Sequence, residues 1–460
     1  MGFAASPWAK ATTTAPSWAV PLRSHVRRRA DLEAIHRAGV EAVEPGQLVA
    51  RNVERRGTRL AIDLGERTVH ARVDALFVAG AGKAAVAMAE AVARIAPEVP
   101  GVVVAPPGRH GPVGRIEVLR GSHPVPDRSS FRSTDRLLRR LRRRPAGDTV
   151  LFLLSGGASA LLARPAPGVA PADKIRLGRL LLRWGADIEL TNMVRKHVSA
   201  VKGGGILRAV SPRRVVSLVL SDVIGDPLPT IGSGPTVPDP STYEDAWRGL
   251  EGLGVLEQLP PTIRARLRAG RAGLASARET VKPATPEARR SLAAVIGSNR
   301  IALRAAAAAA RRLGYRVRTR SRPLAGDAAA AAGELVRSLG APVEPQCVLA
   351  GGETTVDVGD QRGVGGRNQE FAVAAMRPLA GRGWSLLAAG TDGIDGQTPA
   401  AGGLADGTSL RRAGTRRVSR ALREHDSHRL LAALGDTLTT GPTGTNVMDL
   451  VVALGGPEPE

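Results

Sequence analysis

The sequence predicts an α/β fold in two domains, and three observations support this prediction. The chain has 460 residues, a length that suits two or three typical domains. Short apolar runs alternate with stretches of helical spacing, a pattern typical of parallel strands covered by helices on both faces. Hydrophobic residues make up 43% of the chain and charged residues 23%, which excludes a collagen, a coiled coil and a wholly disordered chain.

The N-terminal half begins with a helix, predicted from about residue 32, where apolar residues repeat at helical spacing. A second, Ala-rich helix is predicted at 84–94, directly after the first of several apolar runs. We interpret these runs as buried strands, at residues 74–79, 102–105, 149–154 and 214–220. The stretch 255–290 holds few strand signals and several prolines, so we expect a helix followed by a linker.

The alternation of strands and helices restarts after this linker. A helix is predicted at 301–313. Further strands are predicted at residues 293–296, 315–320, 346–350 and 385–389, and a terminal apolar run occupies residues 450–454. We therefore expect an N-terminal domain at 23–288 and a smaller C-terminal domain at 289–460. Residues 1–22 are rich in Ala, Ser, Thr and Pro, and we expect them to form a disordered extension.

The composition of the chain bears on the cellular compartment and on the binding partners that we expect for the protein. The single cysteine, Cys347, cannot form an internal disulfide, so a reducing cytoplasm is the simplest location. No stretch of about 18 uncharged apolar residues occurs, and we expect no membrane-spanning helix. The net charge of +23 could indicate a nucleic-acid partner. However, nearly all basic residues are Arg, which suggests a coding bias, and the few aromatic residues offer little for bases to stack on. We therefore expect no nucleic acid among the partners.

Several predicted strands end in glycine together with small, hydroxylated or acidic residues. In open α/β sheets, ligands bind beyond the carboxyl ends of the strands, and Gly-rich turns into helices expose N–H groups that suit phosphate. We therefore expect an anionic ligand between the domains. The residues expected to bind a nucleotide are Ser155, Gly156, Gly157, Ser159, Gly351, Gly352, Glu353 and Thr354. A tight turn with a serine N-cap would explain a single such segment equally well.

Charged residues accompany these turns. Lys83, in the turn GAGK, is a candidate ligand for phosphate or carboxylate. Arg367 follows two glycines near a predicted helix start, where a guanidinium can stabilise transferring phosphoryl oxygens. Asp222 ends a predicted strand and is a candidate Mg²⁺ ligand or base, with an Asx-turn as the alternative. Asp392 repeats this strand-end arrangement. Together these residues favour phosphoryl transfer with Mg²⁺.

A predicted helix places several polar side chains on one face. Asn192, Arg195, Lys196 and Ser199 have the spacing of such a face. We expect Arg195 and Lys196 to bind an anionic substrate, and a solvated charged face is the alternative.

Longer strings resemble the glycerate 2-kinase family that carries a C-terminal MOFRL domain. They are GAGKAA (80–85), GSHPVPD (121–127), LFLLSGGASALL (151–162), NMVRKHVSAVKGGGIL (192–207), SDVIGDPLPTIGSGPTVPDPST (221–242), GGETTV (351–356), GGRNQE (365–370), GTDGIDGQT (390–398) and GPTGTNVMDL (441–450). The resemblance covers roughly residues 32–454.

The resemblance implies ATP-dependent phosphorylation of D-glycerate to 2-phosphoglycerate with Mg²⁺. It implies a Rossmann-like N-terminal domain, a smaller α/β C-terminal domain and an active site in the cleft between them. Lys83 and Arg367 match the family's catalytic pair. We expect Asp222 to act in catalysis and as metal ligand, and Asp392 to join Arg195 in binding substrate. The expected partners are ATP and D-glycerate, and the expected state is a monomer or homodimer.

The sequence departs from the family pattern at four positions. Ala158 stands where a third glycine is usual, and it would cost stability if that position needed a positive φ. Trp184 replaces a small residue, and His425 and Met448 each replace a common Asn. We expect these changes to affect substrate preference rather than the class of reaction.

Two alternative functions remain open. A hydroxypyruvate reductase that uses NAD(P)H would rest on the imperfect GAGKAA match to a dinucleotide-binding turn. A non-catalytic nucleic-acid-binding protein would rest on the charge of +23 and the Arg-rich stretch 136–144.

Overall fold

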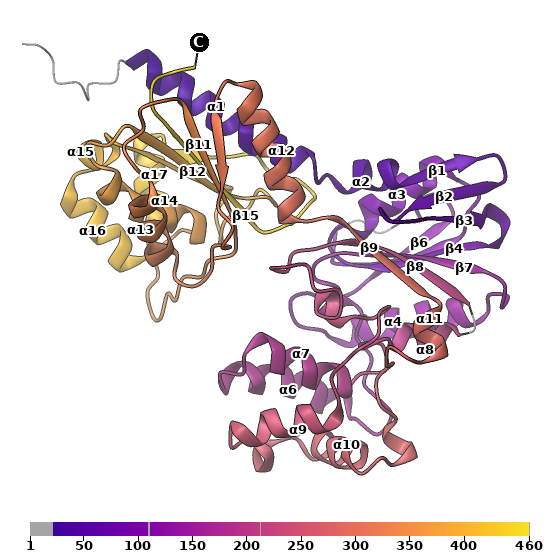
Figure 1. Ribbon diagram of the computed structural model, residues 1–460. Helices are drawn as coiled ribbons and strands as arrows, with labels where there is room; N and C mark the ends of the chain where they lie inside the picture. The colour runs from indigo at the N-terminus through magenta and orange to yellow at the C-terminus, as the bar shows by residue number, and fades with distance from the viewer. Residues whose placement is uncertain (1–21, 109–110, 212, 460) are drawn as a thin grey trace, which may run out of the picture.

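The computed structural model describes residues 22–108, 111–211 and 213–459. The extension predicted for residues 1–22 lies outside the described residues, apart from Leu22. The described chain forms two six-stranded sheets, a three-stranded sheet and a group of helices that lies away from both large sheets (Figure 1). The predicted α/β class, with a parallel sheet and a second α/β unit, is confirmed.

The first large sheet is parallel throughout, in the order β6-β5-β4-β7-β8-β9. Its strands are β4 (Leu76–Ala81), β5 (Gly101–Ala105), β6 (Ile116–Arg120), β7 (Thr149–Leu154), β8 (Arg214–Leu220) and β9 (Ser291–Gly297). Every residue of β4 and β7 is buried, as expected for central strands covered on both faces. The predicted strands at 149–154 and 214–220 coincide with β7 and β8.

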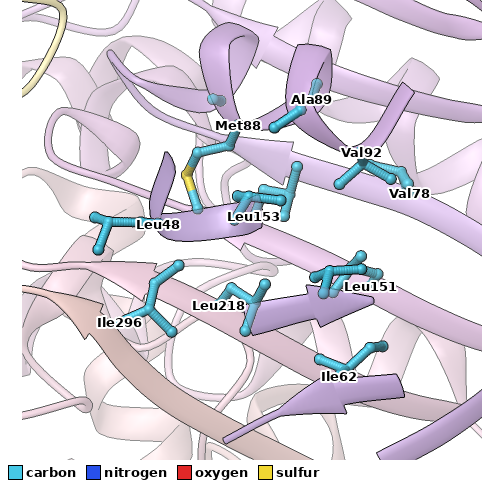
Figure 2. Close-up of a cluster of buried hydrophobic side chains, with 14 of the residues drawn as sticks. Leu48, Ile62, Val78, Met88, Ala89, Val92, Leu151, Leu153, Leu218 and Ile296 are labelled. Atoms are coloured by element: carbon cyan, nitrogen blue, oxygen red, sulfur yellow. The ribbon is translucent and has the colours of Figure 1, made fainter. Parts of the chain in front are cut away.

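Helices cover both faces of this sheet. One face carries α2 (Pro45–Asn52) and α3 (Ala85–Ile95), and the other carries α4 (Arg128–Arg142), α5 (Ala158–Leu161), α8 (Gly205–Val210) and α11 (Pro286–Arg289). Figure 2 shows the first of these cores, where Met88 and Val92 of α3 meet Leu151 and Leu153 of β7. A small antiparallel sheet extends this core with β1 (Val53–Arg56), β2 (Arg59–Asp63) and β3 (Thr68–Arg72).

Four helices form the group that lies away from the large sheets, which we call the helical lobe (Figure 1). They are α6 (Pro171–Arg183), α7 (Ile188–His197), α9 (Tyr243–Gly252) and α10 (Pro261–Arg271). Leu181 of α6, Val194 of α7 and Trp247 of α9 share a separate core. Local signals start the helices: the Asp187 carboxylate accepts the N–H of Leu190 at 2.7 Å. Short 3₁₀ turns complete the chain, namely η1 (Val73–Ala75), η2 (Ile231–Ser233), η3 (Leu256–Gln258) and η4 (Ala275–Ala277).

The second large sheet is mixed, in the order β10-β11-β15-β12-β13-β14. Its strands are β10 (Arg316–Thr319), β11 (Gln346–Gly352), β12 (Trp384–Gly390), β13 (Gly402–Asp406), β14 (Thr437–Leu438) and β15 (Asp449–Gly455). Only β10 and β11 pair in parallel, because β15 enters between β11 and β12 in the opposite direction. The parallel pairing expected from the strand–helix alternation therefore does not extend across this sheet.

Helices also cover both faces of the second sheet. One face carries α1 (Leu22–Glu41) and α12 (Asn299–Arg312). The other face carries α13 (Ala328–Ser338), α14 (Arg367–Leu379), α15 (Ser409–Ala413), α16 (Thr415–Glu424) and α17 (Ser427–Leu434). Cys347 is buried in the sheet, and burial raises the pKa of its thiol to about 12.

The predicted division at residue 288 assigns two segments, β9 and α1, to the wrong unit. Strand β9 completes the first sheet by pairing with β8, although it follows residue 288. The helical lobe separates these two strands in sequence, so the alternation is interrupted before the sheet is complete. Helix α1 packs on α12 and β15 of the second sheet, and α2 packs on α3. The chain thus passes between the sheets at residues 42–44 and again at Ser298.

Within the described residues, no helix has both the length and the apolar character needed to cross a membrane.

Candidate active site

The turns that follow β4 and β7 are bonded to each other. The N–H of Lys83 donates to the carbonyl of Gly156 at 2.8 Å, and the N–H of Ala84 donates to Oγ of Ser155 at 3.0 Å. Gly82 has a φ of 142°, and a Cβ there would overlap the Ser155 hydroxyl. The glycine between them therefore lets two strand ends come close enough to hold Lys83 in place.

Three functional side chains converge on the glycines after β7. A Cβ on Gly156 would overlap the carboxylate of Asp222, and a Cβ on Gly157 would lie 3.0 Å from His123 Cδ2 and 3.2 Å from Lys83 Cγ. Burial raises the pKa of Asp222, while the charge of Lys83 opposes this rise. Burial and the charge of Lys83 both lower the pKa of His123. The small glycines thus bring a cation, an imidazole and a carboxylate together.

A cavity of about 260 Å³ opens beside this cluster. Its polar lining residues are His123, Ser159, Asn192, Arg195, Asp222 and Thr230. They come from four regions of the chain: His123 follows β6, Ser159 follows β7, α7 supplies Asn192 and Arg195, and the loop after β8 supplies Asp222 and Thr230. No other side chain within the described residues donates a hydrogen bond to Asp222. Its carboxylate is therefore available to a molecule in the cavity.

A chain of hydroxyl groups fixes one wall of the cavity. Oγ of Ser233 lies 3.0 Å from Oγ of Ser159 and donates to Oδ1 of Asn192 at 3.0 Å. Nζ of Lys202 donates to the carbonyl and to Oγ of Ser159, at 2.7 and 2.9 Å. Ser233 has a φ of 63°, so the tight turn at η2 is what points this hydroxyl at α7.

The second half of the expected site is built around Arg367, the first residue of α14. Its guanidinium donates to both carboxylate oxygens of Asp449, at 2.6 and 3.0 Å, and lies 2.9 Å from Oε1 of Glu353. Nδ2 of Asn299 donates to the carbonyl of Asp449 at 2.9 Å and so anchors the start of β15. The Asp395 carboxylate accepts the backbone N–H groups of residues 368 and 369, which fixes the start of α14.

Electrostatic effects link the residues around Asp222 to those around Arg367. Burial raises the pKa of Glu353, and the negative charges of Asp449, Asp222 and Asp392 raise it further, against the effect of Arg367. Asp222 follows the first sheet, whereas the other three carboxylates belong to the second. Carboxylates from both sheets thus face one another closely enough for each to oppose the ionisation of Glu353.

Several residues that we predicted to bind nucleotide or substrate also have a packing or hydrogen-bonding role within the protein. Oγ of Ser155 already accepts a backbone hydrogen bond. A Cβ on Gly351 would overlap Asn299, and a Cβ on Gly352 would overlap the backbone of Leu324. Thr354 is buried. Asp392 is half-buried, and its carboxylate accepts the N–H of Ile394 at 3.2 Å.

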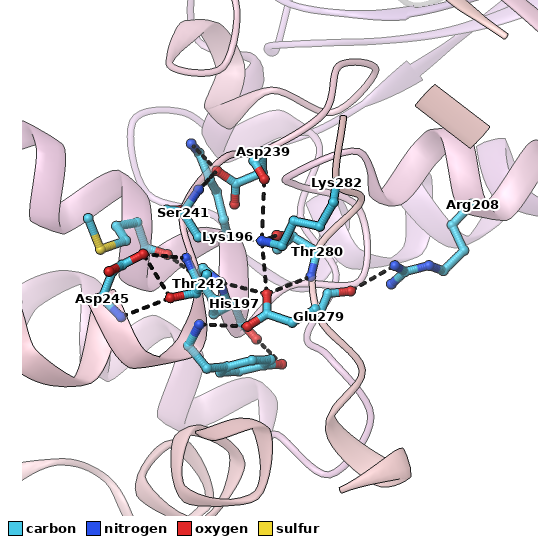
Figure 3. A network of polar contacts seen from close by, with 12 residues as sticks. Lys196, His197, Arg208, Asp239, Ser241, Thr242, Asp245, Glu279, Thr280 and Lys282 are labelled. Carbon is cyan, nitrogen blue, oxygen red and sulfur yellow. Dashed lines mark hydrogen bonds and ion pairs between the residues drawn. The ribbon is translucent and has the colours of Figure 1, made fainter. Parts of the chain in front are cut away.

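Lys196 lies differently from the sequence prediction. Its ammonium is 3.0 Å from Oδ1 of Asp239, with side-chain exposures of 8% and 0%, and it does not line the cavity (Figure 3). Successive residues on a helix point about 100° apart, so α7 presents Arg195 to the cavity and turns Lys196 towards the polar network in Figure 3. The sequence spacing alone did not separate these two directions.

The four departures from the family pattern differ in their backbone setting. Ala158 begins α5 and is not among the residues with positive φ, so the expected strain is absent. His425 and Met448 do have positive φ, of 51° and 72°, in the region that Asn tolerates better than most residues. Trp184 donates its indole N–H to Gln258 at 3.1 Å in the helical lobe.

Four site residues were not identified from the sequence: His123, Ser233, Asn299 and Asp449. His123 does lie in the string GSHPVPD, and Asp449 lies where an apolar run begins. Neither position carries a local pattern that specifies its partner, because the contacts join segments far apart in the chain.

Comparison with known proteins identifies the family. Residues 31–268 match the family described as domain of unknown function DUF4147, and residues 346–449 match the MOFRL family. The glycerate 2-kinase of Pyrococcus horikoshii is 38% identical over 425 residues, which cover 90% of this chain and 94% of that protein. The chain belongs to the glycerate 2-kinase family.

A solved member of this family has the same architecture. The crystal structure of glycerate kinase from Thermotoga maritima matches with a TM-score of 0.79 at 34% identity, over 94% of this chain and all of that one. A family relative from Agrobacterium vitis, named putative hydroxypyruvate reductase, is 40% identical over 82% of this chain and 87% of its own length. The predicted family is confirmed, and the chain is a kinase.

Proposed function

We propose that this kinase phosphorylates the 2-hydroxyl group of D-glycerate, with ATP as the phosphoryl donor and Mg²⁺ as the cation. The observation that carries the proposal is the cavity that both the carboxylate of Asp222, which accepts no hydrogen bond from another described side chain, and the cation of Arg195 line. A hydroxy acid needs such a pair, because its carboxylate must be bound while its hydroxyl loses a proton. Family membership supplies the class of reaction.

Each residue of the site then has a proposed task. Arg195 binds the substrate carboxylate through charge-assisted hydrogen bonds. Asp222 accepts the proton of the attacking hydroxyl, since burial raises the pKa of its carboxyl towards the range of a base. Asp392 is the alternative base or a substrate ligand on the second half. Lys83 and Arg367 neutralise the charge that develops on the transferred phosphoryl oxygens.

The residues present fit a magnesium ion. Within the described residues, no group of three or more His, Cys, Asp or Glu side chains is placed to enclose a metal. Mg²⁺ does not need such a cage, because it keeps several waters and often takes one or two carboxylates together with substrate phosphates. Asp222 would hold it, with Glu353 as second ligand, because burial and the negative charges of neighbouring carboxylates raise the pKa of Glu353 and a cation would relieve this repulsion. Where Asp222 holds the ion, Asp392 takes the proton of the hydroxyl group. The ion would supply positive charge at the phosphates.

The predicted nucleotide segments remain part of the proposal. The turn after β7 holds Gly156, Gly157 and Ser159, and the turn after β11 leads through Glu353 to Thr354. Both turns follow the carboxyl ends of strands, where phosphates are commonly bound. Movement of the two sheets towards each other would bring these turns together and exclude water from the reaction.

The first test measures ADP release with Mg·ATP and D-glycerate, and assigns the phosphorylated carbon by ³¹P–¹H NMR. We expect a phosphate on carbon 2. Lys83→Ala and Arg367→Ala should each lower kcat by about a thousandfold, since each removes a charge used in the transition state. Arg176→Ala, an exposed arginine on α6, is the control and should keep normal turnover. Near-normal kcat in both site variants would refute the assignment.

A reductase is the second candidate, because the A. vitis relative carries that name. Oxidation of NADH or NADPH in the presence of hydroxypyruvate would support it. If a sample that releases ADP with D-glycerate oxidises neither cofactor, the reductase activity is excluded and the kinase activity stands.

A further inference from the structure

Three cations that the proposed reaction does not fully explain line one cavity, and two of them come from the helical lobe. They are Lys174 of α6, Arg195 of α7 and Lys202, just before α8, and we call them the cation cluster. Lys174 is 9% exposed and Lys202 is 3% exposed. Buried lysines are normally paired with an acid, because an isolated buried ammonium is costly. The cation cluster is therefore unusual enough to need an explanation.

Among the residues that the structure describes, the cation cluster donates hydrogen bonds only to neutral groups. Nζ of Lys174 donates to the carbonyl of Val198 at 3.2 Å, and Nζ of Lys202 donates to Ser159. Arg195 makes no hydrogen bond or ion pair with any residue that the structure describes. No carboxylate in the described part of the chain forms an ion pair with any of the three.

Two other lysines in the same region show the usual arrangement. Lys196 is 3.0 Å from Asp239, and Lys282 is 3.0 Å from Glu279 (Figure 3). The same region of the structure thus supplies acids for these two lysines. It leaves the cation cluster without one, so structural pairing does not account for these three residues.

The pKa values of the cation cluster are lowered, since burial and mutual repulsion disfavour the charged forms. Burial, followed by the charge of Arg195, lowers the pKa of Lys174 to about 7. Burial and the charges of Lys174 and Arg195 lower the pKa of Lys202 well below its usual value. A lysine can release its proton under such repulsion, whereas an arginine cannot. Two of the three positions in the cation cluster therefore carry a group that can lose its proton, in a chain whose basic residues are nearly all Arg.

A cavity of about 210 Å³ reaches all three cations. Pro124, Ser159 and Arg195 line both this cavity and the one that contains Asp222. The two spaces therefore adjoin at Arg195. Apolar side chains, among them Leu177 and Val198, line much of the rest and would limit the access of water to a bound anion.

We propose that the cation cluster is the subsite for the substrate's carboxylate, which it holds while the adjacent hydroxyl group extends into the neighbouring cavity towards Asp222. This inference rests on the proposed function and adds Lys174 and Lys202 to the residues that select an acid over a neutral polyol. A substrate carboxylate supplies the negative charge that no described side chain places beside these cations.

Binding must then be coupled to protons. A neutral lysine amine beside an entering carboxylate takes one proton from solvent and becomes an ammonium, so binding above about pH 7 consumes protons. The charged or titratable groups that line the two cavities are Lys174 and Arg179 from α6, Arg195 from α7, Lys202, His123 and Asp222.

The test measures D-glycerate binding to the full chain by calorimetry, without nucleotide, at about pH 8 in two buffers of different ionisation enthalpy. We expect the wild-type chain to take up protons on binding. Lys174→Met and Lys202→Met should each raise Kd by at least about tenfold and reduce proton uptake. Arg176→Met, on the exposed side of α6, should change neither quantity.

Stability supplies an independent readout. Replacing an unpaired buried cation by an apolar side chain removes a desolvation cost, so below about pH 7, where Lys174 is charged, the ligand-free Lys174→Met protein should have an equal or higher Tm. A structural role would instead lower Tm. Lys202→Met also loses two hydrogen bonds to Ser159, so its Tm serves only to show that it folds. If one variant does not fold, the other decides the outcome.

The outcomes separate the two proposals. Proton-coupled binding of D-glycerate by a wild-type chain that releases no ADP would support the subsite and refute the proposed reaction. Normal turnover together with unchanged Kd in folded Lys174→Met and Lys202→Met would overturn the subsite and leave the reaction standing. A folded wild-type chain that binds no D-glycerate would also overturn the subsite.

Discussion

Both carboxylate oxygens of Asp449 accept hydrogen bonds from Arg367, at 2.6 and 3.0 Å. This bidentate pair, together with Glu353, holds the guanidinium at the start of α14 in one orientation. The pKa of Arg367 is raised: burial opposes the rise, and the hydrogen bonds and charge of Asp449 overcome it. Asp449 is thus a positioning residue for a proposed catalytic arginine.

Asp449→Asn should lower kcat by about 10- to 100-fold while leaving KM for D-glycerate nearly unchanged, because the arginine loses orientation but the substrate cavity is intact. Steady-state ADP release measures both constants. Asp436→Asn is the matched control, since Asp436 also pairs with an arginine, Arg412, at 2.6 Å. A kcat within twofold of wild type in a folded Asp449→Asn protein would contradict the role.

Asp222→Asn should separate activity from stability. Because the pKa of Asp222 is raised by burial, the folded protein keeps a proton that the unfolded chain has already released. Stability therefore falls as pH rises from the ordinary pKa of Asp through the raised value. At neutral pH the substitution should raise Tm, while loss of the base lowers kcat by about a hundredfold or more.

The wild-type pH–rate profile is the second measurement on Asp222. Activity should decline on the acid side at a pH above the ordinary pKa of Asp, and this limb should vanish from the residual activity of Asp222→Asn. Asp360→Asn, on an exposed loop, should keep the wild-type profile. An unchanged acid limb in Asp222→Asn would transfer the role of base to Asp392.

Lys196→Met should destabilise the protein by about 3–5 kcal/mol, because it leaves the buried carboxylate of Asp239 without its counter-charge. Denaturant unfolding measures the change. The double variant Lys196→Met/Asp239→Leu should recover part of the loss, since both charges are then absent. A double variant less stable than Lys196→Met would show that the pair is not the source of the effect.

Gly351→Ala should lower stability by about 1–3 kcal/mol, because the new methyl group overlaps Asn299. Displacing Asn299 removes its hydrogen bonds to the carbonyls of Val447 and Asp449, so kcat should fall as well. Gly340→Ala is the control, since a Cβ there meets no atom within 4 Å. Equal stability of the two variants would refute the packing argument.

Much of the fold follows from local pattern. The apolar run at 149–154 is β7, and the glycine-rich turn after it lies next to Lys83 as expected for neighbouring parallel strands. Such features depend on residues close in sequence. The antiparallel entry of β15 between β11 and β12 depends instead on pairing between segments distant in the chain, which no periodicity records.

The same distinction applies to the site. Lys83, Asp222 and Arg195 could be proposed as site residues from the sequence because each has a local context, at a strand end or on a polar helix face. Asp449 and Ser233 act through partners that the fold brings from far away. Lys174 has no local signal except the rarity of lysine in this chain, and its meaning depends on burial that only the folded structure provides.

The two passages of the chain between the sheets constrain how the halves can move. Residues 42–44 and Ser298 are two covalent connections, and Oγ1 of Thr445 donates to the carbonyl of Val43 at 2.7 Å beside the first of them. Two connections define an axis, and rotation about this axis is the rigid-body motion that leaves both unstretched. We expect rotation about this axis to set the distance between Arg367 and the substrate cavity, so a substitution at either connection should alter catalysis without touching a proposed catalytic residue.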